Sequence, residues 1–318
     1  MALGIGIIGL GVMGAGHLRT LADVPDASVV AVSDVDLARA RAVAGEDVEV
    51  HPDPRALILS DAVEAVLVVS SDATHADFVL ACLEAGKPVL CEKPLAPTAA
   101  ESLAVAEAEA ELGRRLVQVG FMRRFDPGYV EVKRALDEGE VGAPLMLHCA
   151  HRNASVPPTY TTDMLVTSSG THEIDIARWL IGEEIVGARV LSARVTSRAR
   201  DGVLDPQLLI LETESGVLVD VEVFANAGYG YDIRCELVGE RGTVALPPAV
   251  APGFLERFAD AYLAELTDWV GAVSDGGPRG PTAWDGYAAA AVADACLESL
   301  AEGRPVAVEL ASRPALYR

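Results

Sequence analysis

Up to about residue 120, short apolar runs alternate with segments of helical periodicity. The apolar runs lie at 3–8, 28–33, 65–69, 87–91 and 116–119, and the helical patterns lie between them at 12–22, 36–44, 73–85 and 98–112. Strands buried on both faces read as continuous apolar runs, and strand-helix alternation builds parallel sheets with right-handed crossovers. The pattern therefore predicts an α/β fold with a doubly wound parallel sheet.

The pattern changes after about residue 142. Longer strand-like runs occupy 144–152, 186–197, 207–213, 217–225 and 232–238, with helical patterns at 171–181, 254–273 and 282–302. Such runs predict a large open, mostly antiparallel sheet. Because 318 residues exceed what one core usually holds, we expect two domains, residues 1–121 and 122–318. The closing helices are candidates to pack back on the first domain.

The first apolar run ends in a glycine motif. Gly9-Leu10-Gly11-Val12-Met13-Gly14 follows the strand and precedes a helical pattern. In this order Gly9 makes the tight turn, Gly11 lets the backbone approach a pyrophosphate, and Gly14 lets the helix pack on the strand. The helix start then presents its N–H groups to the anion. The motif predicts a dinucleotide-binding Rossmann domain.

A second feature supports this prediction. The apolar run 28–33 ends at Asp34, about 20 residues beyond the third glycine, where the fold needs an acid for the ribose hydroxyls. An isolated Asp here would be read as a turn or cap residue. Together with the glycines, Asp34 indicates NAD in preference to NADP, because its charge repels a 2′-phosphate.

Composition excludes several kinds of partner. The net charge is −22 with a pI near 4.6, which argues against nucleic acid and anionic membranes. Although 51% of the residues are hydrophobic, the sequence contains neither an 18-residue apolar run nor the basic start of a signal peptide. Five scattered cysteines without a C-x-x-C pair indicate buried thiols in a reducing compartment. We therefore expect a cytoplasmic protein.

Metal ligands are sparse in the sequence. His148 and His151 lie three apart in a predicted strand, so their side chains point to opposite faces. We therefore expect a site without a metal. A better candidate for chemistry is Lys93, because Glu92-Lys93-Pro94 follows the run 87–91 at the carboxyl end of a parallel strand, where doubly wound folds form their ligand crevice.

These residues resemble a known family, that of glucose–fructose oxidoreductase, inositol dehydrogenase and rhizopine catabolism proteins. The resemblance rests on the glycine motif, Asp34, Ala73-Thr74-His75 and Glu92-Lys93-Pro94, followed by an open sheet. Within the family, the chain is similar to myo-inositol 2-dehydrogenases in five further segments, which are 120–126, 151–153, 160–164, 172–175 and 229–232. The resemblance implies NAD(H), a polyol substrate that is oxidised to a ketone, and a homotetramer joined through the open sheets.

The resemblance also implies roles for individual residues. Lys93 would bind the reacting hydroxyl, and His172 would take its proton as hydride leaves the carbon, a role suited to imidazole. The matching substrate-lining residues are Met122, Arg123, His151, Asn153, Ser168 and Tyr231. The matching cofactor-binding residues are Gly9, Gly11, Val12, Met13, Gly14, Asp34, Ser70, His75, Glu92 and Lys93.

One position departs from the family pattern. Where inositol dehydrogenases carry an aspartate four residues before the catalytic histidine, this chain has Ser168. A carboxylate one helical turn from an imidazole would orient it and stabilise its charged form. Ser168 has three interpretations. It is a weakened partner of His172, or its small side chain makes room for another ring substituent, as in an aminocyclitol, a methylated inositol or a sugar. It also fits a helix N-cap. Asp175, one turn further on, is a candidate replacement for the missing carboxylate.

Structural explanations of the same residues stay open. His172 with Ile176 and Leu180 fits a core histidine, Tyr231 fits a strand aromatic, and Arg123 beside Arg124 fits a solvated pair in which one side chain faces inward. Some relatives are binding proteins that keep the nucleotide fold without catalysis. A regulator that binds NAD or a sugar is therefore the alternative from another functional class, and NAD reduction with a panel of cyclitols and sugars discriminates between the two.

Overall fold

The computed structural model describes residues 2–318, which divide into two compact units. Unit 1 consists of the residues up to Met122 together with Asp260–Tyr287 and Ser312–Arg318. Unit 2 consists of Arg123–Ala259 and Ala288–Ala311. Both units are therefore assembled from separate stretches of the chain.

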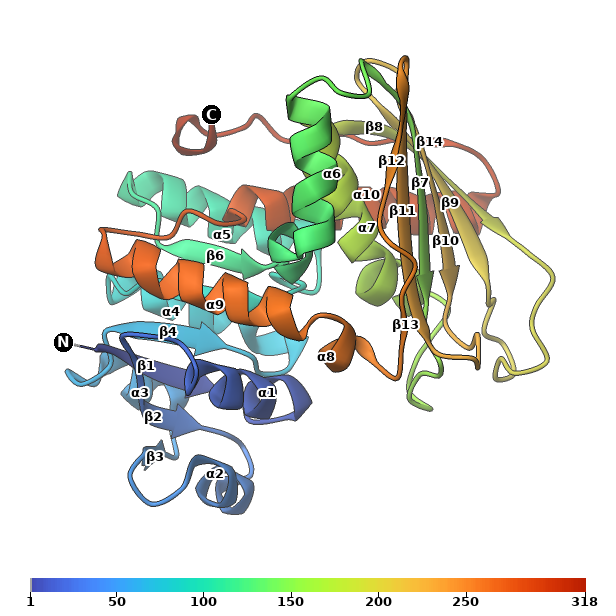
Figure 1. The fold of residues 1–318 in the computed structure, drawn as a ribbon. Helices are drawn as coiled ribbons and strands as arrows, with labels where there is room; N and C mark the ends of the chain where they lie inside the picture. Colours follow the sequence, from blue (N-terminus) through green and yellow to red (C-terminus); the bar gives the residue numbers. More distant parts are fainter. Residues whose placement is uncertain (1) are drawn as a thin grey trace. The chain divides into compact units, whose positions relative to one another are not determined.

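Unit 1 contains a six-stranded parallel sheet (Figure 1). Its strand order is β3-β2-β1-β4-β5-β6, so the order reverses between β1 and β4. In doubly wound sheets, ligands bind at the carboxyl ends of the strands at such a reversal. The strands are β1 (Leu3–Ile8), β2 (Ala27–Ser33), β3 (Glu49–His51), β4 (Ala65–Val68), β5 (Val89–Glu92) and β6 (Val117–Gly120).

Helices cover this sheet, and their starts are capped by residues that the sequence supplies at the right places. Asp36 accepts hydrogen bonds from the N–H groups of Ala38 and Arg39, and Thr98 caps the start of the helix that follows it. The helices are α1 (Val12–Leu21), α2 (Leu37–Ala44), α3 (Pro54–Leu59), α4 (His75–Glu84), α5 (Ala99–Leu112) and α9 (Ala259–Ser274).

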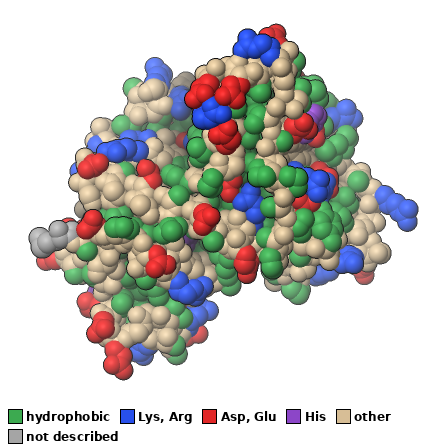
Figure 2. All heavy atoms as spheres, in the orientation of Figure 1, with side chains coloured by type: hydrophobic (Ala, Val, Ile, Leu, Met, Phe, Trp, Pro, Cys, Tyr) green, Lys and Arg blue, Asp and Glu red, His purple; other side chains and the backbone are tan. Residues whose placement is uncertain are grey.

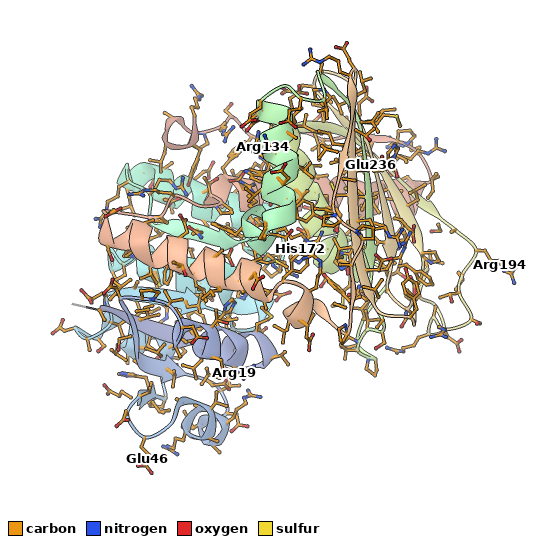
Figure 3. All side chains as sticks on the ribbon, in the orientation of Figure 1. Arg19, Glu46, Arg134, His172, Arg194 and Glu236 are labelled. Atoms are coloured by element: carbon orange, nitrogen blue, oxygen red, sulfur yellow. The ribbon has the colours of Figure 1, made fainter. Side chains whose placement is uncertain are left out.

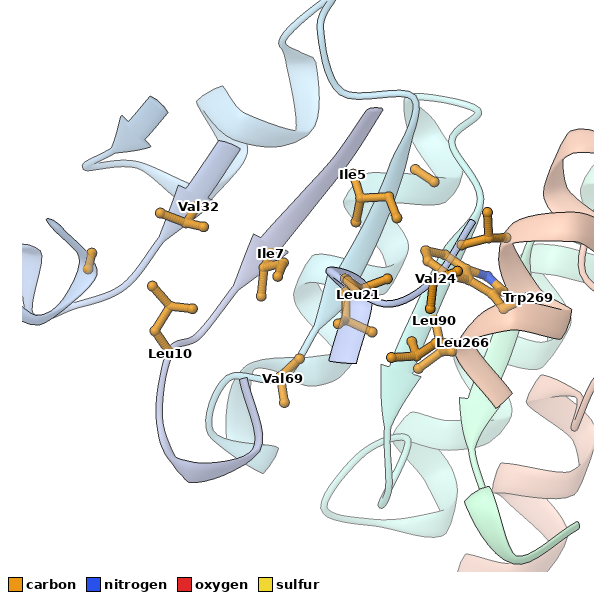
Figure 4. Close-up of a cluster of buried hydrophobic side chains, with 14 residues drawn as sticks. Ile5, Ile7, Leu10, Leu21, Val24, Val32, Val69, Leu90, Leu266 and Trp269 are labelled. Carbon is orange, nitrogen blue, oxygen red and sulfur yellow. The ribbon is translucent and has the colours of Figure 1, made fainter. Parts of the chain in front are cut away.

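The core of unit 1 joins the two ends of the sequence. Ile5 and Ile7 of β1 and Leu90 of β5 belong to the same buried cluster as Leu266 and Trp269 of α9 (Figure 4). Burying a large side chain stabilises a fold by about 1.5–3 kcal/mol. The cluster therefore binds α9 to the sheet that precedes it by more than a hundred residues.

Unit 2 contains an eight-stranded sheet in the order β12-β11-β7-β10-β9-β8-β14, with β13 paired to β11. The β7 and β10 pair is parallel and the other neighbours are antiparallel, as expected for an open, mostly antiparallel sheet. The strands are β7 (Pro144–Arg152), β8 (Ile185–Ser192), β9 (Gln207–Thr213), β10 (Leu218–Phe224), β11 (Tyr231–Gly239), β12 (Gly242–Ala245), β13 (Val250–Ala251) and β14 (Val306–Ala307).

The two faces of this sheet differ in character. On β7, Leu147, Cys149 and His151 are buried on the face that α7 contacts. His148 lies on the other face and pairs with Asp220 of β10. This confirms that His148 and His151 point apart. The remaining α-helices of the described residues are α6 (Pro127–Asp137), α7 (Thr171–Ile181), α8 (Phe254–Arg257) and α10 (Ala283–Glu302), and a π-helix, Leu165–Gly170, directly precedes α7.

Several expected boundaries were wrong. The run 186–197 ends as a strand at Ser192, and the run 254–273 divides into α8 and α9. The short elements β3 and α3 were missed because three and six residues are too few to show a period. Helix α6 was also missed, although Asp126 as the cap and Pro127 in the first turn form a recognisable start signal.

The helices, cysteines and surface charges of the structure can be compared with the predictions from composition. Within residues 2–318, no helix is both long and apolar enough to span a membrane. All five cysteines are buried and unpaired by disulfides. Acidic and basic side chains are interspersed on the face that Figure 2 shows, although acids outnumber bases in the sequence.

Candidate functional site

The glycine loop between β1 and α1 has the geometry of a dinucleotide cradle. Gly9 has a φ of +97°, and a Cβ on Gly14 would lie 2.0 Å from the Gly9 carbonyl oxygen. A Cβ on Gly11 would meet no atom of the described residues within 4 Å. Val12 beside it is 68% exposed. The backbone is therefore closely packed at Gly9 and Gly14 and open at Gly11, where a pyrophosphate would approach. These residues fit a dinucleotide cofactor.

Asp34 follows β2 and is held beside this loop. Its carboxylate accepts hydrogen bonds from the backbone N–H groups of Leu10 at 2.6 Å and Asp36 at 2.8 Å, and from Arg39 at 2.7 Å. Burial alone would raise the pKa of Asp34, but these hydrogen bonds and the Arg39 charge lower it below its usual value. Asp34 is therefore a fixed anion next to the glycine loop.

Lys93 follows the last residue of β5 and is half-buried. Glu92 before it is buried and forms an ion pair with His17 of α1. The Pro94 carbonyl after it accepts a hydrogen bond from the Nδ1 atom of His75. Nε2 of His75 lies 3.2 Å from the Ser70 carbonyl oxygen, so both ring nitrogens of His75 contact backbone carbonyls within unit 1.

In unit 2, a buried charged cluster lies next to His172 in the sequence and in space. Glu173 forms an ion pair with Arg123, and the Nδ1 atom of His151 lies 3.1 Å from both Glu173 Oε2 and Arg123 Nη2. The ring centroids of His151 and His172 are 6.2 Å apart. Burial would raise the pKa of Glu173, but the charges of Arg123 and His151 hold it below its usual value.

Aromatic rings surround the cluster. Tyr231 of β11 is buried and packs edge-on against His151 at 5.6 Å and against Phe258 at 6.2 Å. Arg123 lies 5.4 Å above the Phe258 ring, and Arg257 lies over the same ring. Burial raises the pKa of Tyr231. The predicted residues Arg123, His151, His172 and Tyr231 are therefore brought together in unit 2, where Figure 3 shows His172 on α7.

A neutral hydrogen-bond network adjoins this cluster. Tyr160 lies 2.7 Å from the hydroxyl of Ser169, which also accepts a hydrogen bond from Asn153 at 3.2 Å. Ser168 is half-buried and contacts Tyr160 as well. Burial raises the pKa of Tyr160 to about 12, against the opposing effect of the two serines.

The structure bears on two of the alternatives that the sequence leaves open, the N-cap role of Ser168 and the replacement of the carboxylate by Asp175. The N-cap of α7 is Gly170, so the interpretation of Ser168 as that cap was wrong. The carboxylate of Asp175 binds both Nε and Nη2 of Arg124, so this carboxylate is engaged by an arginine. The side chains of Arg123 and Arg124 are both largely buried, whereas the sequence predicted that one of these two side chains faces inward.

The candidate residues are divided between the units. Unit 1 carries Lys93, Met122 and the cofactor-binding candidates, and unit 2 carries His172 and the other substrate candidates. No group of three or more potential metal ligands lies close together in residues 2–318. Two buried polar residues of these sites, His17 and Glu173, were missed from the sequence. His17 lies three residues after Gly14 in the helix that follows the glycine loop, and Glu173 directly follows His172. These positions are the signals that could have identified the two residues.

Comparison with known protein families places the three parts of the chain in one family. Residues 3–121 match the oxidoreductase family with an NAD-binding Rossmann fold, residues 129–245 match the GFO/IDH/MocA C-terminal domain, and residues 249–308 match the C-terminal alpha/beta domain of the same oxidoreductase family. The chain therefore belongs to the Gfo/Idh/MocA family of oxidoreductases, which confirms the resemblance seen in the sequence.

Individual relatives have more specific names. The chain is 55% identical to inositol 2-dehydrogenase 2 of Saccharopolyspora erythraea, over 100% of this chain and 98% of the relative. It is 47% identical to inositol 2-dehydrogenase of Burkholderia cenocepacia, over 100% of both. The crystal structure of myo-inositol dehydrogenase from Lactobacillus casei, in complex with NAD(H) and myo-inositol, is similar with a TM-score of 0.96 and 34% identity over 100% of both chains.

Proposed function

We propose that the chain is an NAD-dependent inositol 2-dehydrogenase that oxidises a hydroxyl of myo-inositol to a ketone. The observation that carries the proposal is the full-length similarity to inositol 2-dehydrogenases. The glycine cradle and the buried cluster around His172 supply the two kinds of site that this reaction needs. NAD, when bound, provides the acceptor for the hydride that leaves the substrate carbon.

The residues of this chain have the following proposed roles. Lys93 binds the reacting hydroxyl through its ammonium group, and His172 accepts the hydroxyl proton as the C–H bond breaks. The substrate is lined by Met122, Arg123, His151, Asn153, Ser168 and Tyr231. The cofactor is bound by the glycine loop with Val12 and Met13, and by Asp34, Ser70, His75, Glu92 and Lys93. We assign the cofactor domain to residues 1–121 and the substrate and oligomerisation domain to 122–318, with Asp260–Tyr287 and Ser312–Arg318 of the second range packing in unit 1.

Two alanine variants test the chemistry. Lys93→Ala and His172→Ala should each lower turnover by about 10²–10⁴-fold, the usual contribution of a general acid or base, with little change in NAD affinity. Lys133→Ala and His51→Ala remove the same residue types at sites away from the candidates and should leave turnover unchanged. NAD reduction is measured with myo-inositol, other cyclitols and sugars. Absence of NAD reduction with every compound would favour the regulator.

The substrate range depends on Ser168. If Ser168 is a weakened partner of His172, Ser168→Asp should raise turnover on myo-inositol. If Ser168 makes room for a larger or amino-bearing cyclitol, the same change should impair the best substrate of the wild type and leave myo-inositol poor. The same panel of compounds, applied to both proteins, separates these outcomes.

We also propose a homotetramer joined through the outer face of the unit 2 sheet. Met146 and Leu218 pair across β7 and β10 on this face and are exposed, and Leu191 of β8 lies on the same face. Exposed apolar side chains beside ion pairs suit contact with a second copy. Light scattering should give a molar mass four times that of the chain. Met146→Glu places a charge on this face and should lower the measured molar mass. The cytoplasmic location remains a proposal, supported by five buried free thiols.

A further inference from the structure

The turn that carries Lys93 is contacted on both sides by buried histidines. His17 of α1 binds the residue before Lys93, and His75 of α4 binds the residue after it. Each histidine is 1% exposed. The two rings come from different helices of unit 1, so they fix the turn from two independent directions.

On the first side, the Glu92 carboxylate links α1 to the Lys93 backbone. His17 Nε2 donates to Glu92 Oε1 at 2.7 Å, and the Lys93 N–H donates to Glu92 Oε2 at 3.2 Å. A Cβ on Gly120 would lie 3.1 Å from this carboxyl group, so the glycine of β6 leaves room for it. Burial would raise the pKa of Glu92, but His17 and then the Lys93 charge lower it. Glu92 is therefore an anion whose direction His17 sets.

On the second side, His75 holds the carbonyl that follows Lys93. Its Nδ1 atom donates to the Pro94 carbonyl oxygen at 2.7 Å, while Nε2 faces the Ser70 carbonyl oxygen at 3.2 Å. Ser70 follows β4, so the ring joins the ends of two neighbouring strands. Because both ring nitrogens contact backbone carbonyl oxygens, His75 fixes the position of the backbone that follows Lys93.

We propose that His17 and His75 are positioning residues for Lys93. This inference rests on the proposed function, in which Lys93 binds the reacting hydroxyl. His17 acts through Glu92, and His75 acts through the Pro94 carbonyl. A displacement of a catalytic group by about 1 Å can cost about 10²-fold in rate, so loss of either contact should lower kcat without removing any group that touches the substrate.

The two ring nitrogens give opposite predictions for two amide substitutions. The amide nitrogen of Asn reaches about as far as Nδ1, and that of Gln reaches about as far as Nε2. His17 contacts the turn through Nε2, so His17→Gln should keep most of the activity and His17→Asn should lose about 10–100-fold in kcat. His75 contacts the turn through Nδ1, so His75→Asn should retain a higher kcat at saturating NAD than His75→Gln.

The control is His51, which lies beside Glu49 on β3, at the far edge of the same sheet. His51→Asn and His51→Gln should both match the wild type in kcat, KM and Tm. For the His17 variants, NAD binding is measured directly by titration and should change by less than about threefold. For the His75 variants, the same titration is used to correct turnover to full saturation with NAD, because His75 is also a candidate cofactor residue. Equal activity of the Asn and Gln variants at positions 17 and 75 would overturn the inference.

A double-mutant cycle with Lys93 distinguishes positioning from general damage. If His17 and His75 act through Lys93, then His17→Asn and His75→Gln should cost little further turnover in a Lys93→Ala background. An undiminished cost in that background would show that they act elsewhere and would refute the inference alone. Normal turnover of Lys93→Ala would instead refute the proposed role of the lysine, which separates the two failures.

Discussion

The buried pair of Arg123 and Glu173 offers a sharp test of what stabilises unit 2. Both side chains are almost fully buried, and each contacts the other and His151. Glu173→Gln keeps the shape of the side chain and removes its charge. The Arg123 guanidinium would then lose its buried anionic partner, although it would keep its contact with the Phe258 ring.

The expected size of the effect follows from this burial. Removing one partner of a buried ion pair costs about 3–5 kcal/mol, because the remaining charge is left without compensation in a medium of low polarity. The Gln side chain still offers one oxygen acceptor to Arg123, which favours the lower end, about 3 kcal/mol. For a domain of this size, 1 kcal/mol corresponds to roughly 2–4 °C, so we expect Tm to fall by roughly 6–12 °C.

Calorimetry at pH 7 measures this change, and the matched control is Glu131→Gln. Glu131 pairs with Arg134 on α6, but both side chains are largely exposed, so the same substitution should leave Tm unchanged. A fall of less than about 2 °C for Glu173→Gln would refute the reasoning. It would mean that Arg123 is stabilised equally well by its other contacts.

Three other predictions rest on separate contacts. Asp34→Ala should narrow the preference for NAD over NADP, measured as the ratio of kcat/KM values, and a wild-type preference for NADP would contradict the assignment. The folded-state pKa values of Glu92 and Glu173 lie below the usual value of 4.5, so the contribution of both carboxylates to stability is complete above pH 4.5 and is lost as the pH falls below it. Urea unfolding at pH 7, 4.5 and 3.5 should show a falling free energy of unfolding, and a constant value would contradict this prediction. Tyr317→Phe removes a hydrogen bond to Glu109 of 2.6 Å and should lower the unfolding free energy by about 1.5–3 kcal/mol in the same assay; an unchanged value would show that this contact does not stabilise the C-terminal residues.

The sequence predicted the parallel sheet of unit 1 well because its central strands are buried on both faces. Such strands leave uninterrupted apolar runs, as Ile5–Ile8 and Ala65–Val68 show. Their order and the glycine loop then follow from general rules of handedness and turn conformation. The alternation along β7 likewise separated His148 from His151 correctly.

Other features depend on partners far away in the sequence and therefore leave no local signal. Glu173 is an ordinary acidic residue on a helix until the fold brings Arg123 and His151 to it. His17 is one more residue of α1 until β5 places Glu92 beside it. Glu173 directly follows His172 and Glu92 directly precedes Lys93, but the partners of both carboxylates are decided by tertiary structure.

The segment before His172 shows how a local assumption changes the meaning of a residue. A regular α-helix would place position 168 one turn before His172, but residues Leu165–Gly170 form a π-helix, which has a wider turn. In this turn Ser169 is buried and bonded to Tyr160 and Asn153, while Ser168 is half-buried beside Tyr160. A carboxylate at position 168 would therefore meet the buried phenol of Tyr160. The serine preserves a neutral network there, while the residue after His172, Glu173, is an anion that pairs with Arg123.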